Sequence, residues 1–256
     1  AKIRQAGIPY ETPGRAALPG RLEGVLAVIY LVFSEAYGGD PARSLAIEAI
    51  GLGRRLNTLL PGAPGVMGLL ALMLLHEARR AARLDGAGDL VLLEDQDRGL
   101  WDPGMISEGL ALVEASLRTP GAKSPYAVQA AIAALHARAQ IAAETDWRQI
   151  AGLYEVLVHM HPTPVVALNQ AAAIAMAEGP AAGLERVEAL ERGGALESYP
   201  LLASLKGELL RRLGRDAEAA VAYREALDLA RFEPEKRLLW RRLAEVGGYA
   251  ARTDSP

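Results

Sequence analysis

The fold of this chain is decided by residues 200–231, which read PLLASLKGELLRRLGRDAEAAVAYREALDLAR. Small residues and one aromatic residue follow each other here at intervals of seven, five, four and three: Gly207, Gly214, Ala219, Tyr223 and Ala226. Small residues where two helices cross, with an aromatic residue where the crossing needs bulk, are typical of a tetratricopeptide helix–turn–helix repeat. Such repeats stack into curved scaffolds that bind other molecules. The segment therefore predicts a helical binding scaffold.

The same pattern continues upstream of this segment. Gly179 lies 35 residues before Gly214, and residues 163–191 read as another helix pair. Its turn is expected at Gly179-Pro180, because glycine accepts the left-handed conformation that ends a helix and proline fits the first turn of the next one.

Two further segments follow the helical pattern. Asp146 is expected to cap the start of a helix that ends at His161-Pro162. A more degenerate helix pair spans residues 44–80, with Pro61 and Pro64 between its helices. Because apolar residues recur at threes and fours throughout, we expect an all-α fold. It is a right-handed, tetratricopeptide-like superhelix of about eleven helices over residues 20–256.

Composition agrees with packed helices and limits the classes of function. Hydrophobic residues make up 51% of the chain and aromatic residues 5%, so alanine and leucine form most of the core. The chain has no cysteine, which excludes disulfides and thiolate zinc sites and fits a reducing cytoplasm. The apolar run 25–33 is shorter than the roughly 20 residues that span a bilayer. A net charge of -3 argues against direct DNA binding.

One block, residues 76–102, interrupts the helical pattern; it reads HEARRAARLDGAGDLVLLEDQDRGLWD. A Gly-rich turn at 85–89 between short apolar runs predicts a small β-hairpin insertion at about 82–98. Charges of both signs gather around it with a histidine and a tryptophan, which makes the block a candidate partner-binding site. Its candidate residues are His76, Arg79, Arg80, Arg83, Asp85, Glu94, Asp95, Asp97, Arg98 and Trp101.

Three interpretations of this block stay open. In the first, it is an ion-paired insertion that only covers one end of the superhelix, since exposed ion pairs are individually weak. In the second, it binds a partner: its arginines meet a carboxylate or phosphate in fork geometry, and Trp101 is the aromatic anchor. In the third, Asp95 and Asp97 bind a hard cation or act as acid and base, although the rest of a calcium loop is missing.

The concave groove of the superhelix is a second candidate site. Its candidate lining residues are Tyr126, Gln129, His136 and Asn169. Asn169 is polar within an apolar helix, which fits either a groove contact or a hydrogen bond between helices. Because a helical groove can enclose a ligand, a small-molecule sensor is the alternative class of function. His159 and His161 do not share a helix face, so we expect no zinc site there.

Several stretches of the chain together resemble one type of protein. They read AKIRQAGIPYETP, RLEGVLAVIYLVFSEAY, GLLALMLLHEARRAARLDGAGDLVLLEDQDRGLWD, SPYAVQAAIAALHARA, TDWRQIAGLYEVL with PTPVVALNQAAAIA, and LLRRLGRDAEAAVAYREAL. Over nearly its whole length the chain resembles the C-terminal, tetratricopeptide-like extension of extracytoplasmic-function (sigma-24-like) RNA polymerase sigma factors. The block with LLEDQDR and the following tryptophan is the most specific part.

The resemblance implies a domain organisation and a role. Residues 1–19 would be the tail of sigma region 4 and a linker, followed by the helical domain at 20–256. The helical domain would be a noncatalytic, cofactor-free regulatory module of a bacterial, cytoplasmic transcription initiation factor. Its partners would be the sigma domains of the same protein or core RNA polymerase, and the promoter-reading domains are absent from this chain.

Overall fold

The computed structural model describes residues 18–35, 43–120 and 123–253. This part of the chain forms eleven α-helices, which confirms the predicted all-α helical-hairpin fold. Their bounds are α2 (Leu18–Glu35), α3 (Arg43–Leu59), α4 (Pro64–Glu77), α5 (Pro103–Arg118), α6 (Pro125–Arg138), α7 (Trp147–Met160), α8 (Pro164–Glu178), α9 (Pro180–Arg192), α10 (Pro200–Arg212), α11 (Asp216–Leu229) and α12 (Glu233–Thr253). Short 3₁₀ turns lie at Arg80–Ala82, Arg98–Leu100 and Ala142–Glu144.

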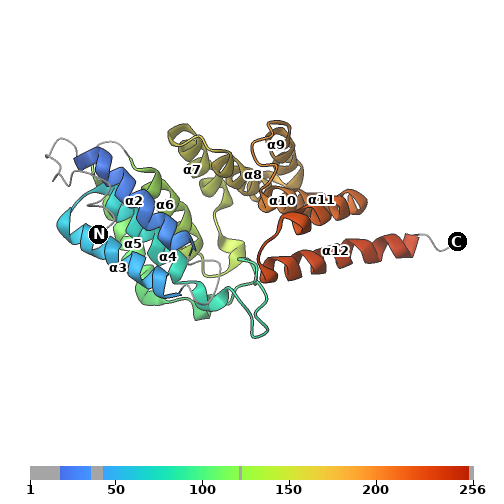
Figure 1. The fold of residues 1–256 in the computed structure, drawn as a ribbon, viewed down its shortest axis with the longest axis horizontal. Helices are drawn as coiled ribbons and strands as arrows, with labels where there is room; N and C mark the ends of the chain where they lie inside the picture. Colours follow the sequence, from blue (N-terminus) through green and yellow to red (C-terminus); the bar gives the residue numbers. More distant parts are fainter. Residues whose placement is uncertain (1–17, 36–42, 121–122, 254–256) are drawn as a thin grey trace, which may run out of the picture.

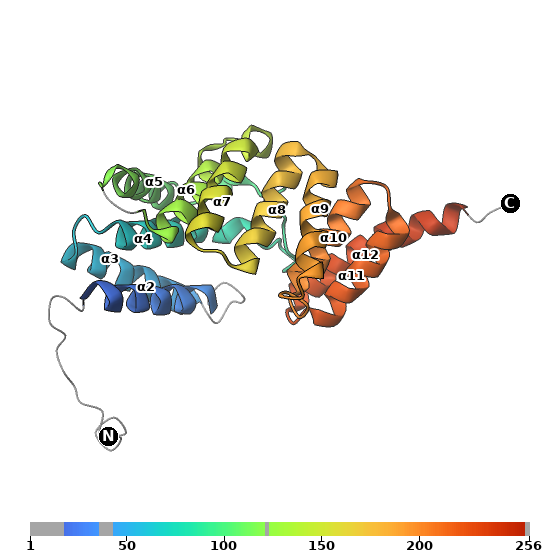
Figure 2. The ribbon, with the colours of Figure 1, turned by 90° about the horizontal axis from the view of Figure 1, so that it is seen from above.

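The helices form an elongated array. Helices α2 to α6 make a bundle at one end, and α7 to α12 continue from it as a row of helical hairpins (Figure 1, Figure 2). Each helix packs against the next one along the chain, as in α8–α9 and α10–α11. Helix α12 extends beyond α11 at the end of the array opposite α2 (Figure 1).

Helix α4 is the centre of the N-terminal bundle because its sequence is apolar on every face. It packs against α2, α3, α5 and α6, and every residue from Val66 to Leu75 is buried. The contact with α6 is especially close: a Cβ atom on Gly68 would lie 2.5 Å from the backbone nitrogen of Ala127. The bundle therefore depends on a glycine at this crossing.

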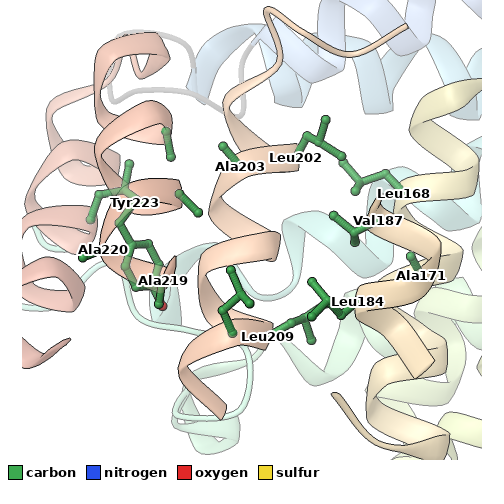
Figure 3. Packing of buried hydrophobic residues seen from close by; sticks show 14 of the residues in the cluster. Leu168, Ala171, Leu184, Val187, Leu202, Ala203, Leu209, Ala219, Ala220 and Tyr223 are labelled. Atoms are coloured by element: carbon green, nitrogen blue, oxygen red, sulfur yellow. The ribbon is translucent and has the colours of Figure 1, made fainter. Parts of the chain in front are cut away.

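The repeat segment packs as its spacing predicts. Ala219, Tyr223 and Ala226 of α11 are all buried, and Figure 3 shows Tyr223 and Ala219 facing α10. A Cβ atom on Gly207 would lie 2.7 Å from Cδ1 of Tyr223, so the tyrosine ring fills the space that glycine leaves. Gly214, with φ of +73°, makes the turn between the two helices.

The predicted helix ends are confirmed as well. The Asp146 carboxylate accepts a hydrogen bond from the Gln149 N–H at 2.9 Å at the start of α7, which ends at Met160. Gly179, with φ of +110°, separates α8 from α9. The break between α3 and α4 contains Pro61, and Pro64 is the first residue of α4.

The predicted β-hairpin is reduced to one antiparallel bridge, between Leu84 and Leu90, and the described residues there form no strand. Asp85 closes the turn: its Oδ1 accepts hydrogen bonds from the N–H groups of Ala87 and Asp89, both at 2.9 Å. Two backbone hydrogen bonds of 2.9 Å join the arms of the loop, from the Asp85 N–H to the Asp89 carbonyl oxygen and from the Val91 N–H to the Arg83 carbonyl oxygen. We call residues 84–93 the strap.

Two further expectations concern the start of the chain and the membrane. Of the predicted tail and linker at 1–19, residues 1–17 lie outside the described residues. Helix α2 begins at Leu18. In the described ranges, no helix is both long and apolar enough to cross a bilayer.

Candidate functional site

A groove of about 630 Å³ lies between the strap, the α6–α7 connection and helices α8, α10 and α12. Its volume falls within the range of small-molecule pockets, roughly 300–1,000 Å³. Most of its lining is apolar: Leu92, Leu93, Ala142, Ala143, Trp147, Leu168, Ala172, Ala175, Met176, Leu201, Leu205, Leu209, Leu238 and Leu239. Polar side chains also line it: Glu94, Arg98, His136, Thr145, Asn169, Ser204, Glu208, Arg212, Tyr223 and Arg242.

Alternate helices of the row supply one wall of the groove. The lining residues of α8, α10 and α12 recur every three or four positions, so each helix presents a single face. The α10 face runs from Leu201 through Leu205 and Glu208 to Arg212. This periodicity was present in the sequence, but it did not reveal which helices share a groove. Glu208, Arg212 and Arg242 were therefore missed as candidates.

Glu208 is the centre of a charged network in this wall. Its carboxylate accepts hydrogen bonds from Nε and Nη2 of Arg211, at 3.1 and 2.6 Å, and from the Tyr223 hydroxyl at 3.1 Å. Arg242 Nε lies 3.7 Å from the same carboxylate. Burial, and then the Glu208 carboxylate, raise the pKa of Tyr223 above its ordinary range. The negative charge of Glu208 is thus paired with arginines of the same protein.

Arg98 forms part of the opposite wall, and its contacts are structural. Its Nη1 donates to the carbonyl oxygens of His136 and Ala139, the latter at 2.8 Å, at the C-terminal end of α6. Its guanidinium lies 4.6 Å from the centroid of the Trp101 ring. The guanidinium of Arg79 lies 5.7 Å from the same centroid. Arg98 therefore holds the insertion to the end of α6.

Two neutral histidines lie beside these arginines. Burial, and then the charges of Arg79 and Arg98, lower the pKa of His136 to about 4. Burial, and then Arg79, Arg83 and His136, lower the pKa of His76 to about 3. The charges of the neighbouring arginines thus lower the pKa of both imidazoles, as burial does.

The strap bounds one side of the groove and contacts α12, about 150 residues further along the chain. Arg237 Nε donates to the Asp89 carboxylate, and Arg237 Nη2 donates to the Gly88 carbonyl oxygen at 2.7 Å. One turn later, Arg241 Nη1 lies 3.7 Å from the same carboxylate. A second, smaller cavity of about 250 Å³ lies between strap and helix, so the two are joined by charge rather than by tight packing.

The structure corrects the role predicted for Trp101. We expected an accessible aromatic anchor, but the side chain is only 5% exposed and lies under two arginines. Tryptophan is common in cores as well as in binding sites, and the sequence did not distinguish the two. Arg80 likewise makes an internal ion pair, at 2.7 Å, with the buried carboxylate of Glu77.

The acidic candidates divide into two groups. Asp85 and Asp97 cap local turns, and Asp97 Oδ1 accepts a hydrogen bond from the Gly99 N–H at 2.8 Å. Glu94 and Asp95 are exposed. Among the described residues, no three His, Asp or Glu side chains come together as metal ligands. Asp95 and Asp97 therefore belong to no such group of metal ligands among the described residues.

The groove candidates also divide. His136 and Asn169 line the groove together with Glu94 and Arg98. Tyr126 and Gln129 do not line it; Tyr126 packs edge-on against Tyr30 in the N-terminal bundle, with ring centroids 5.6 Å apart. The two candidate sites of the sequence thus meet in one groove.

Comparison with known proteins adds relatives without a known role. The sequence pattern of a family of unknown function, DUF6596, matches residues 21–117, which run from the first turn of α2 through the strap to the last turn of α5. An uncharacterized protein of Rhizobium meliloti (strain 1021) is 46% identical over 237 residues, or 90% of this chain and 55% of the relative. The chain therefore spans about half the length of the curated relative that it matches.

Proposed function

We propose that this chain is a noncatalytic regulatory domain of a bacterial sigma factor and acts in the cytoplasm during transcription initiation. The observation that carries the proposal is the row of helical hairpins with an open groove, an arrangement suited to binding rather than catalysis. The resemblance of nearly the whole chain to sigma factor extensions is the reason for proposing transcription initiation as the process. The partners are the sigma domains of the same protein or core RNA polymerase.

The exposed acidic side chains after the strap provide a contact surface for such a partner. Glu94 and Asp95 are both exposed, and their carboxylates make no hydrogen bond or ion pair with other described residues. Complementary charges of this kind steer association and set specificity. A basic partner surface fits them without disturbing Asp97, which caps a turn.

The test is a pull-down of this chain with the isolated sigma domains and with core polymerase. The Glu94→Lys/Asp95→Lys variant is expected to lose capture, whereas a matched Glu185→Lys/Glu225→Lys variant on exposed positions of α9 and α11 retains it. Wild-type chain that captures neither partner contradicts the proposal. Equal capture by both variants would show that Glu94 and Asp95 do not form the contact with the partner.

Small-molecule sensing is the second candidate function. The volume of the groove and its mostly apolar lining favour it. A sensor of this kind is compatible with the first proposal, because a ligand in the groove can regulate the contact of the domain with its partner.

A further inference from the structure

The charges that line the groove are not all balanced within the protein. Glu208 already accepts hydrogen bonds from Arg211 and Tyr223. Arg242 shares that carboxylate and also donates to Glu245 at 2.9 Å. The acid that remains, Glu94, is exposed at the rim.

Arg212 is different from the other groove arginines. Its Nη1 lies 3.2 Å from the sulfur of Met176, and this is its only polar contact with the described residues. A thioether is a weak acceptor, whereas a guanidinium has five N–H donors in a fork that matches a carboxylate. Arg98, by contrast, is already engaged with backbone carbonyl groups and the Trp101 ring.

Neutral polar groups beside Arg212 are available too. Asn169 of α8 and Ser204 of α10 line the groove, and neither side chain bonds to another described residue. Next to them, Leu201 is 48% exposed, which is high for a leucine in a concave wall. On the opposite side of the groove lies Arg98, whose charge, together with that of Arg79, adds to burial in lowering the pKa of His136.

We propose that the groove binds an apolar small molecule with one carboxylate, which pairs with the guanidinium of Arg212 while Leu201 and Leu205 contact the apolar part. This inference rests on the proposed function, since it takes the groove to be the binding site of a regulatory domain. Charge complementarity selects an acid over an amine, and the cavity volume selects a small molecule over a folded partner.

Decanoate is a suitable probe, with methyl decanoate and decyltrimethylammonium as uncharged and cationic counterparts. Thermal unfolding and calorimetry of the whole chain should show stabilisation by decanoate above that by the other two, because a ligand of the native state raises apparent stability. Arg212→Gln should bind decanoate about tenfold more weakly, the loss expected for one charge-assisted pair. Arg224→Gln, on the exposed side of α11, is the matched control and should bind as wild type.

A second variant tests the place of binding. Ala172→Phe inserts a ring into the groove from α8 and should abolish decanoate binding while the unliganded protein still unfolds cooperatively. The inference is overturned if the ester binds as tightly as the acid, or if Arg212→Gln binds as wild type. It is equally overturned if decanoate does not bind while the sigma domains are captured by wild type and lost with Ala172→Phe. The groove then holds a polypeptide segment, and the proposed function stands without a small acid.

Discussion

At the scale of single residues, the crossing of α10 and α11 depends on one missing side chain. A Cβ atom on Gly207 would lie 2.7 and 2.8 Å from two atoms of the Tyr223 ring, which is 1% exposed and bonded to Glu208. Gly207→Ala should destabilise the protein by about 1–2 kcal/mol in urea unfolding, because overpacking outweighs the gain in helix propensity. Gly51→Ala, with open space around it in α3, should instead be neutral or stabilising. Equal effects of the two changes would contradict this account.

The buried histidines make stability depend on pH. An unfolded histidine titrates near 6.5, whereas His136 titrates at about 4 and His76 at about 3 in the native chain. Acidification therefore protonates the unfolded state first, and stability should fall below pH 6.5. The expected loss is on the order of 1–2 kcal/mol per histidine between pH 6.5 and 5. In denaturant titrations His136→Gln should reduce this slope, and an unchanged slope would exclude His136 as a source.

At the scale of elements, local signals were sufficient for the helices but not for the insertion. The cap at Asp146 and the turn at Gly179 depend on neighbours within three or four residues, so the sequence predicts them directly. The role of Arg98 depends on carbonyl groups 38 and 41 residues away. No local pattern reveals such a distant acceptor. The same limit concealed the burial of Trp101, because packing between elements decides it.

This contact of Arg98 predicts an effect on one helix end. Arg98→Lys should lower stability by about 2 kcal/mol, because an ammonium group cannot both reach two carbonyl groups and stack on Trp101. Hydrogen exchange should accelerate most in the last turn of α6. Arg138→Lys, an exposed change in that same turn, should have little effect in thermal unfolding and exchange. A similar loss in both variants would show that the contacts of Arg98 are not responsible.

At the scale of the whole molecule, the groove exists because a loop from the N-terminal half of the chain meets the first turns of α12. Leu92 and Leu93 of the strap and Leu238 of α12 line the same cavity. Repeat spacing within α8 to α12 predicts their stacking, but not the return of a loop from the N-terminal half. Figure 1 shows the loop that precedes α5 lying beside the start of α12. Because the two segments are about 150 residues apart in the chain, the sequence pattern indicates two separate sites rather than one groove.

The contact between strap and α12 should therefore respond to salt. Asp89 pairs with Arg237 and Arg241, whose side chains are 44% and 49% exposed. Such pairs contribute only about 0–1 kcal/mol each and are screened by ions. Hydrogen exchange in residues 86–93 should accelerate when salt rises from about 0.05 to about 0.5 M. Asp89→Asn should exchange fast at both concentrations with little change in global unfolding, whereas Asp95→Asn should follow wild type. Salt-independent exchange in wild type would mean that packing, rather than charge, holds the strap to α12.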